Sequence, residues 1–142
     1  GVNADFGGHI IKKQILKFVK NNQDKSIYIE SMGDKYYLST MKIVNAVVGN
    51  SSSGIVEAPY FKTPTVNIGT RQNGRLFSNS IIHCSFEKND IKKSLNMLES
   101  YKFKNSLKKI RLPYGSPGAS RKIHSILKKK TDITSYKTFY DL

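Results

Sequence analysis

The residues of this chain that are best suited to chemistry lie at positions 50–59, which read NSSSGIVEAP. Three serine hydroxyls and a glycine follow a short apolar run and precede a predicted helix. The first N–H groups of a helix have no partner within it, and the helix dipole favours negative charge there. The hydroxyl-rich turn is therefore a candidate site for a phosphate group.

A carboxylate and two guanidinium groups complete the pattern. Glu57 lies about one turn into the same predicted helix, where its carboxylate can accept hydrogen bonds from sugar hydroxyls. Arg71 and Arg75 follow in a glycine-bearing loop, and their forked donors suit phosphate. Together these residue types predict a nucleotide that carries a sugar. Plainer explanations remain open, because Glu57 can also complement the helix dipole and each arginine can be an exposed surface cation.

The elements that position these residues alternate between helix and strand. Apolar residues recur at helical spacing in some stretches and form short runs typical of buried strands in others. The expected order is a helix around 11–19, a strand at 26–30, a helix around 38–44, a strand at 46–48, a short helix at about 54–61, strands at 65–68 and 80–84, and a helix around 91–98. Strands separated by helices imply a parallel sheet with right-handed crossovers. We therefore expect an α/β fold with a Rossmann-like parallel sheet and flanking helices.

The two ends of the chain are less regular. A short helix around 103–110, a loop at 113–118 and a last helix around 123–127 are expected. We expect one domain at 1–130 and a tail of unknown structure at 131–142. Asn3, Ala4 and Asp5 are typical of the turn after a strand, yet only two residues precede them. The first strand of the domain is therefore expected to be missing.

Composition limits the setting of the domain. A chain of 142 residues with 38% hydrophobic content can form one core of ordinary size. The single cysteine, Cys84, cannot form an internal disulfide, and no apolar run approaches the roughly 18 residues of a membrane span. We expect a cytoplasmic protein without membrane contact. No metal-binding motif is present, so we expect no protein-bound metal.

The formal charge of +14 raises the question of nucleic acid. Positions 102–130 hold many lysines and arginines, no acidic residue, and few aromatic residues. A groove for single-stranded nucleic acid interleaves stacking aromatics with its cations, and no known nucleic-acid signature occurs. The sequence favours a solvated basic surface instead; an acidic partner domain is a further explanation that we keep open.

Four sequence blocks resemble one enzyme family. They read NAD-x-GG near the start, GNSSSGIVEAP, KTPTVNIGTRQNGR, and PYG-x-x-GAS near the end. In this order they resemble the C-terminal half of hydrolysing UDP-N-acetylglucosamine 2-epimerases, over about residues 3–127. The likeness is strongest to the bacterial branch that acts in sialic-acid and legionaminic-acid synthesis.

The resemblance implies a GT-B-like enzyme with two Rossmann-like domains, of which this chain is the C-terminal, nucleotide-holding one. Members of the family eliminate UDP from UDP-N-acetylglucosamine to form a glycal, then add water to give N-acetylmannosamine, without a redox cofactor. Their proton-transferring groups come from the N-terminal domain and the segment joining the halves, so no catalytic residue is expected in this chain. The expected ligands are UDP and a UDP-N-acetylhexosamine, and the expected partners are the missing N-terminal domain and further copies of the enzyme. We expect the fragment alone to be inactive.

The resemblance also assigns roles to the residues of the central motif. Ser51 and Ser52 match serines that contact the diphosphate, and Glu57 matches the glutamate that binds ribose. Arg71 matches an arginine near the diphosphate and sugar. Arg75 is a weaker candidate for the same region.

Two further positions are assigned to the base end of the pocket. Asn3 matches an asparagine near the nucleotide, and Met32 lies where a backbone contact to uracil is expected. Ordinary packing explains Met32 as well. Asp5 lies in a matching block, but capping of the next helix explains it equally well.

Several other residues are expected to have structural roles. The histidines are expected at the surface or at helix ends, the cysteine as a small buried apolar residue, and the tyrosines as core or boundary aromatics. The residues with these expected structural roles are His9, His83, His124, Cys84, Tyr36, Tyr37 and Tyr60.

Three other functions remain as alternatives. The C-terminal domain of a GT-B glycosyltransferase would share the fold and the UDP site but would transfer the sugar to an acceptor. A basic nucleic-acid module would bind unrelated oligonucleotides in a strongly salt-dependent manner. A purely structural half-domain would bind neither ligand.

Overall fold

The computed structural model describes residues 7–130 of the chain. Asn3, Asp5 and the tail at 131–142 lie outside the described residues. The described elements, of which η1 and η2 are short 3-10 helices, are α1 (Gly8–Asn21), α2 (Gly33–Ile43), β1 (Val47–Gly49), α3 (Ser52–Val56), η1 (Ala58–Phe61), β2 (Thr65–Ile68), β3 (Ile81–Cys84), α4 (Lys88–Glu99), α5 (Tyr101–Ser106), η2 (Leu107–Lys109) and α6 (Ala119–Lys129).

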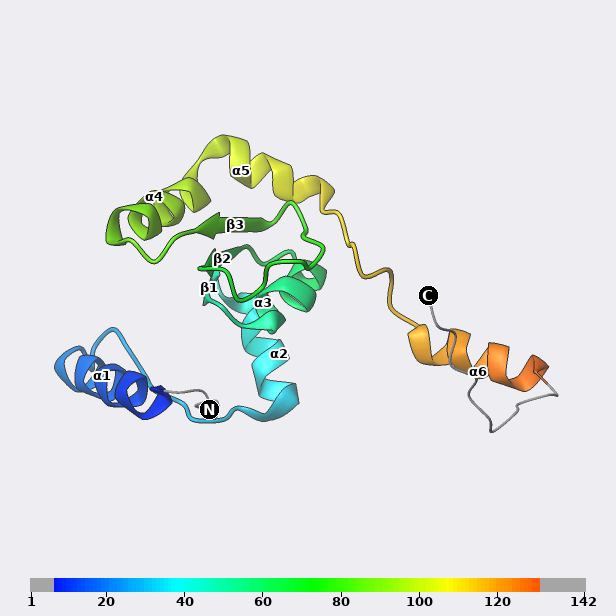
Figure 1. The fold of residues 1–142 in the computed structure, drawn as a ribbon, viewed down its shortest axis with the longest axis horizontal. Coiled ribbons are helices and arrows are strands. Elements are labelled where there is room, and N and C mark those ends of the chain that lie inside the picture. Colours follow the sequence, from blue (N-terminus) through cyan, green and yellow to red (C-terminus); the bar gives the residue numbers. More distant parts are fainter. Residues whose placement is uncertain (1–6, 131–142) are drawn as a thin grey trace, which may run out of the picture.

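The three strands form one parallel sheet in the order β1-β2-β3 (Figure 1). Val47 pairs with Thr65 across the first strand pair, and Asn67 pairs with His83 across the second. Parallel strands end at the same edge, so the segments that follow β1 and β2 leave the sheet side by side. The expected α/β fold with a parallel sheet is confirmed, and the strands predicted at 46–48, 65–68 and 80–84 are found with ends shifted by no more than a residue.

The core lies where α3 packs on the sheet and α2 packs against η1. Ile55 and Val66 are fully buried, and Met41, Ala58 and Ile82 are buried around them. All five are apolar, so their removal from water supplies the hydrophobic stabilisation of this unit.

Buried hydroxyls at the margin of this core are paired with backbone carbonyls. The Thr65 hydroxyl donates to the Gly54 carbonyl at 2.8 Å, and the Thr63 hydroxyl donates to the Met41 carbonyl at 2.7 Å. These bonds join β2 to α3 and the loop before β2 to α2. A buried polar group without such a partner would cost stability, so the two threonines fix how the helices approach the sheet.

The strand predicted at 26–30 is wrong. This segment has no strand pairing, and the side chains of Ile27 and Ile29 are 80% and 48% exposed. An ion pair between Glu30 and Lys12 ties its end to α1 instead. The apolar alternation of the segment suits a strand, but a strand also needs a neighbour for its backbone groups, and none of the described strands pairs with it.

The helix predicted at 54–61 is divided into two elements. α3 begins earlier, at Ser52, and ends before Glu57, where the 3-10 helix η1 takes over. Pro59 lies in the first turn of η1, and a proline has no N–H to continue the α-helical pattern. Glu57 therefore lies at a junction rather than within a helix.

The terminal helices leave their apolar stripes exposed. Ile11 and Phe18 on α1, and Ile123 and Ile126 on α6, are all more than half exposed. Figure 1 shows both helices apart from the sheet, with α6 at the end of an extended segment. Within residues 7–130, no helix is both long and apolar enough to cross a membrane.

Candidate functional site

The serine-rich turn lies at the carboxyl end of β1. The backbone of Ser51 is extended, and its hydroxyl oxygen accepts a hydrogen bond from the Ser53 N–H at 3.3 Å, which makes Ser51 the N-cap of α3. The side chains of Ser51 and Ser52 are exposed. Ligands of open α/β sheets bind outside the carboxyl ends of the strands, and this turn occupies such a place.

The loop after β2 is fastened to this turn. Gln72 Nε2 donates to the Asn50 carbonyl at 2.6 Å, and Arg71 Nη1 donates to the same oxygen at 3.3 Å. Arg71 is thereby brought beside the serine run, as expected from the sequence. Arg75 does not share this contact, and its side chain is exposed.

Gln72 was not predicted as a site residue. It is 3% exposed, and its amide holds the arginine loop against the end of β1. In the sequence, only its position between Arg71 and Arg75 pointed to a role in the site, since glutamines are common in polar loops.

Glu57 is joined to the serine run by a hydrogen-bond relay. The Ser53 hydroxyl donates to the Glu57 carboxylate, and the Tyr37 hydroxyl donates to Ser53 Oγ at 2.8 Å. Glu57 itself is exposed and Tyr37 is half-buried. Tyr37, expected only as a core or boundary aromatic, therefore also contacts the site, whereas Tyr36 is exposed and not part of the core.

Met32 lies at the start of α2, next to this relay. It is half-buried and lines a cavity of about 330 Å³. Tyr37 lines the same cavity, so the cavity adjoins the relay that ends at Glu57. The link between Met32 and the serine turn is thus indirect and runs through Tyr37, which lines the cavity and contacts Ser53.

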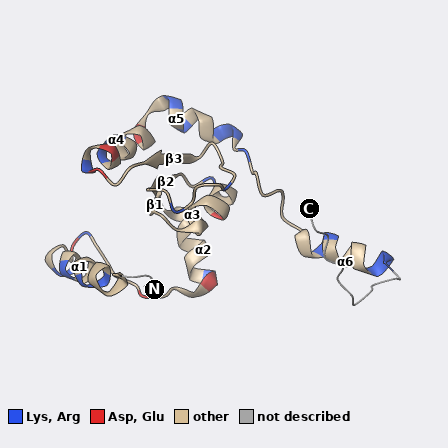
Figure 2. Cartoon of the chain, viewed as in Figure 1, with Lys and Arg blue, Asp and Glu red and all other residues tan. Residues whose placement is uncertain are grey.

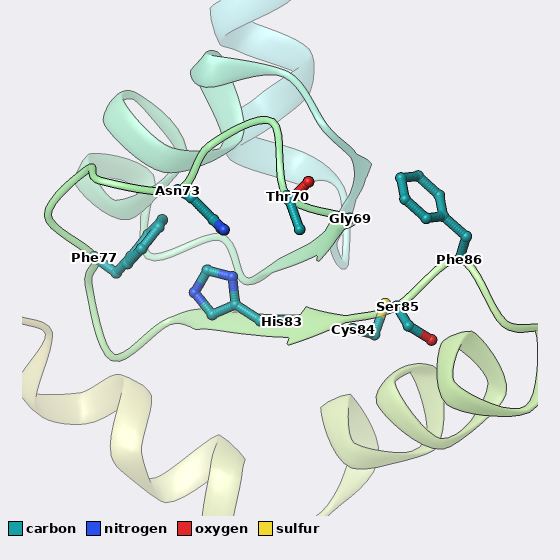
Figure 3. A pocket seen from close by; sticks show the side chains of 8 residues that line it. All are labelled: Gly69, Thr70, Asn73, Phe77, His83, Cys84, Ser85 and Phe86. Carbon is teal, nitrogen blue, oxygen red and sulfur yellow. The ribbon is translucent and has the colours of Figure 1, made fainter.

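A second cavity, of about 610 Å³, lies at the carboxyl ends of β2 and β3 (Figure 3). Thr70 and Asn73 line it from the arginine loop, and Cys84 and Phe86 line it from the end of β3. Cys84 is half-buried there, whereas a buried position was expected. No sequence motif indicates this cavity, because its walls come from two separate segments.

His83 forms part of the wall of the second cavity. Its ring meets the edge of Phe77 with centroids 4.3 Å apart, and its Nδ1 lies 3.2 Å from Asn67 Nδ2. Partial desolvation lowers the pKa of His83 below its usual 6.5, so the neutral ring is favoured. The ring is nevertheless largely exposed, as are His9 and His124, which agrees with the predicted surface positions.

The charges are unevenly distributed over the molecule. Figure 2 shows lysines and arginines along α1, α5 and α6, whereas the fewer acidic residues are scattered and include some on α4 and at the start of α2. In the described part of the chain, no three histidine, cysteine or acidic side chains come together as a metal site would require.

The fold and the site together define a class of protein. A parallel sheet covered by helices, with polar side chains gathered at its carboxyl edge, is a Rossmann-like α/β domain. A sequence model of the UDP-N-acetylglucosamine 2-epimerase family matches residues 2–128. The chain belongs to this family.

Individual relatives agree with this assignment. A Campylobacter jejuni protein named GDP/UDP-N,N'-diacetylbacillosamine 2-epimerase (hydrolyzing) is 40% identical over 99% of this chain. Polysialic acid biosynthesis protein P7 of Escherichia coli is 36% identical over the full chain. UDP-N-acetylglucosamine 2-epimerase of Neisseria meningitidis serogroup B is 39% identical over 63% of the chain and 23% of its own length. The chain spans 36% of the length of each of the first two relatives.

Proposed function

We propose that this chain is the UDP-sugar-binding domain of a hydrolysing UDP-N-acetylglucosamine 2-epimerase. The whole enzyme would convert UDP-N-acetylglucosamine and water to N-acetylmannosamine and UDP, by elimination to a glycal and addition of water at C2. One observation carries the proposal: Ser52, Arg71 and Glu57 lie near one edge of the sheet. Ser52 and Arg71 come together there although they are 19 positions apart in the sequence.

The diphosphate would be held by the serine turn and the arginine loop. The Ser51 oxygen accepts the capping bond, which leaves its proton free to be donated to a phosphate oxygen. Ser52 is exposed beside it. Arg71 spends one of its five N–H donors on the Asn50 carbonyl and retains others for the anion.

The nucleoside would extend from Glu57 towards α2. A carboxylate can accept hydrogen bonds from two adjacent hydroxyls of a ribose, which neutral side chains do less strongly. The cavity lined by Met32 and Tyr37 would then receive the base. We keep Asn3 as a further contact at the base end.

The proton transfers would be performed by groups outside this chain. General acid and base catalysis needs groups within hydrogen-bond reach of the reacting carbon. We assign no such group to the site described above, so the chain alone is expected to bind UDP without turnover. Ser51, Ser52, Glu57 and Arg71 then serve to bind and orient the substrate.

The rest of the enzyme would cover the exposed apolar stripes of α1 and α6. Relatives are almost three times as long as this chain, because it spans 36% of their length. Exposed apolar surface of this kind marks a contact with protein rather than solvent. A homo-oligomer and a cytoplasmic location also belong to the proposal, the latter because a single cysteine suits a reducing compartment.

The test is calorimetric titration of UDP into the chain at two salt concentrations. Glu57→Gln and Ser52→Ala should each weaken binding roughly tenfold or more, because each removes a hydrogen bond to a charged or hydroxyl-rich ligand worth about 1.5–3 kcal/mol. GDP is titrated in parallel, since one relative's name includes GDP.

Matched controls separate the site from the surface. Glu87→Gln and Ser116→Ala change exposed residues of the same types, at the N-cap of α4 and in the loop before α6, and both should leave UDP binding unchanged. Binding that is indifferent to Glu57 and Ser52 would refute the proposed site. The glycosyltransferase alternative is excluded if the whole enzyme forms N-acetylmannosamine without any acceptor.

A further inference from the structure

The hydroxyl of Tyr37, on α2, reaches the serine turn. It donates to Ser53 Oγ at 2.8 Å, and Ser53 in turn donates to Glu57 Oε2. On the basis of the proposed function, we infer that Tyr37 is a positioning residue that holds the ribose-binding carboxylate of Glu57 through Ser53.

The direction of the relay follows from proton counting. A serine hydroxyl has one proton to donate, and Ser53 gives it to the carboxylate. Ser53 must therefore accept, not donate, in its contact with Tyr37, whose phenol supplies its own proton. Ser53 has no proton left for a phosphate oxygen, which sets it apart from Ser51 and Ser52.

The relay orients a carboxylate that would otherwise be free. Glu57 is exposed and lies between α3 and η1, so few packing contacts fix its rotamer. Tyr37 is half-buried on α2 and has only two side-chain torsions, so it loses little entropy as an anchor. Ser53 occupies one acceptor site of Oε2, so Oε1 and the second site of Oε2 remain to accept from two adjacent ribose hydroxyls, and the side chain is ordered before binding.

The consequence is a change in selectivity, not only in affinity. An oriented carboxylate distinguishes a ribose, with two adjacent hydroxyls, from a deoxyribose that lacks the 2′-hydroxyl. We expect the wild-type chain to bind UDP more tightly than 2′-deoxyuridine diphosphate. Tyr37→Phe keeps the ring and removes only the hydroxyl, and it should reduce this ratio of affinities severalfold.

The experiment measures both nucleotides by calorimetry in five forms of the chain: wild type, three variants at Tyr37 and Glu57, and one control. Glu57→Gln should abolish the preference for UDP over the deoxynucleotide. Adding Tyr37→Phe to Glu57→Gln should then cause no further loss of this preference. Tyr36→Phe is the matched control, because Tyr36 is the neighbouring tyrosine on α2 and is 68% exposed. Thermal melts of each form monitor folding.

The outcomes separate this inference from the proposed function. A Tyr37→Phe chain that keeps the wild-type ratio, while Glu57→Gln loses it, would overturn the positioning role and leave the UDP site standing. A loss of affinity that is equal for both nucleotides would show a structural role only and would also overturn the inference. A folded wild-type chain that binds no UDP would overturn both.

Discussion

At the scale of single residues, the three serines of the turn have different tasks despite their shared chemistry. Ser51 caps α3, and the Ser53 hydroxyl donates to Glu57. Ser52 is exposed and makes neither of these two hydrogen bonds. Hydroxyls that satisfy backbone or carboxylate partners contribute to stability, whereas an exposed hydroxyl is available to a ligand. Substitutions at these positions should therefore separate folding from binding.

Ser51→Ala removes the acceptor for the Ser53 N–H and should lower the free energy of unfolding by about 1 kcal/mol, the usual cost of losing an N-cap. Ser52→Ala should stay within roughly 0.5 kcal/mol of wild type, as exposed substitutions do. Urea denaturation measures both. Equal losses in the two variants would contradict the assignment of the cap to Ser51.

His83 should make stability depend on pH. Its pKa is lowered in the folded chain by partial desolvation, so the unfolded chain binds more protons as pH falls below the ordinary value of 6.5. Above pH 6.5 the neutral ring therefore makes its full contribution to the free energy of unfolding. As pH falls from there through the pKa of the folded state, that contribution is lost. His83→Phe keeps a ring against Phe77 and cannot be protonated.

The measurement is urea denaturation of wild type and His83→Phe between about pH 7.5 and 5, a range that spans the ordinary histidine pKa of about 6.5. The difference in unfolding free energy should move in favour of the variant as pH falls. A constant difference would show that the His83 pKa is the same in both states.

At the scale of elements, the close approach of α3 to β2 depends on Gly54. A Cβ built at this position would lie 2.7 Å from Thr65 Cγ2 and 3.3 Å from Thr65 Oγ1. The Thr65 hydroxyl donates to the Gly54 carbonyl, so the strand cannot simply move away from the helix without losing that bond. Gly54 is therefore required because a larger side chain would collide with Thr65, and not because of its backbone conformation.

Gly54→Ala should destabilise the chain by about 1–3 kcal/mol, because it forces overpacking in the core. Thr65→Ser removes Cγ2 but keeps the hydroxyl, so the double variant should recover part of that loss. Thermal or urea unfolding of the four chains gives the coupling energy. Strictly additive effects would mean that the two positions do not compete for the same space.

At the scale of the whole molecule, the charge of +14 and the site predict two kinds of binding. Lysines and arginines on α5, η2 and α6 attract any polyanion by counterion release, without contacts that depend on sequence (Figure 2). The proposed UDP binding would instead depend on the arrangement of Ser52, Glu57 and Arg71. The two should respond differently to salt and to substitution.

Oligonucleotide binding, measured by fluorescence anisotropy, should weaken steeply between about 50 and 200 mM salt and should not change in Glu57→Gln. UDP binding should lose much less affinity over the same range and should depend on Glu57. Tight, salt-resistant binding of one oligonucleotide sequence would instead favour the nucleic-acid module.

The sequence determined the features that are encoded locally. Apolar runs predicted three of the strands, because side-chain period is visible within a few positions. The serines, the glutamate and the arginine were picked out by residue type and spacing, and their role as a nucleotide site stays a prediction. The epimerase resemblance rested on the same short blocks, and the family match over residues 2–128 confirms it.

The tertiary structure decided everything that depends on which segments meet. The extended segment at 26–30 has a strand-like pattern, but no described strand pairs with it. Gln72 fastens the arginine loop to Asn50, and Tyr37 reaches Ser53 from a different helix. Partners that are 16 to 22 positions apart leave no periodic trace in the sequence, because their contact depends on the path of the backbone between them.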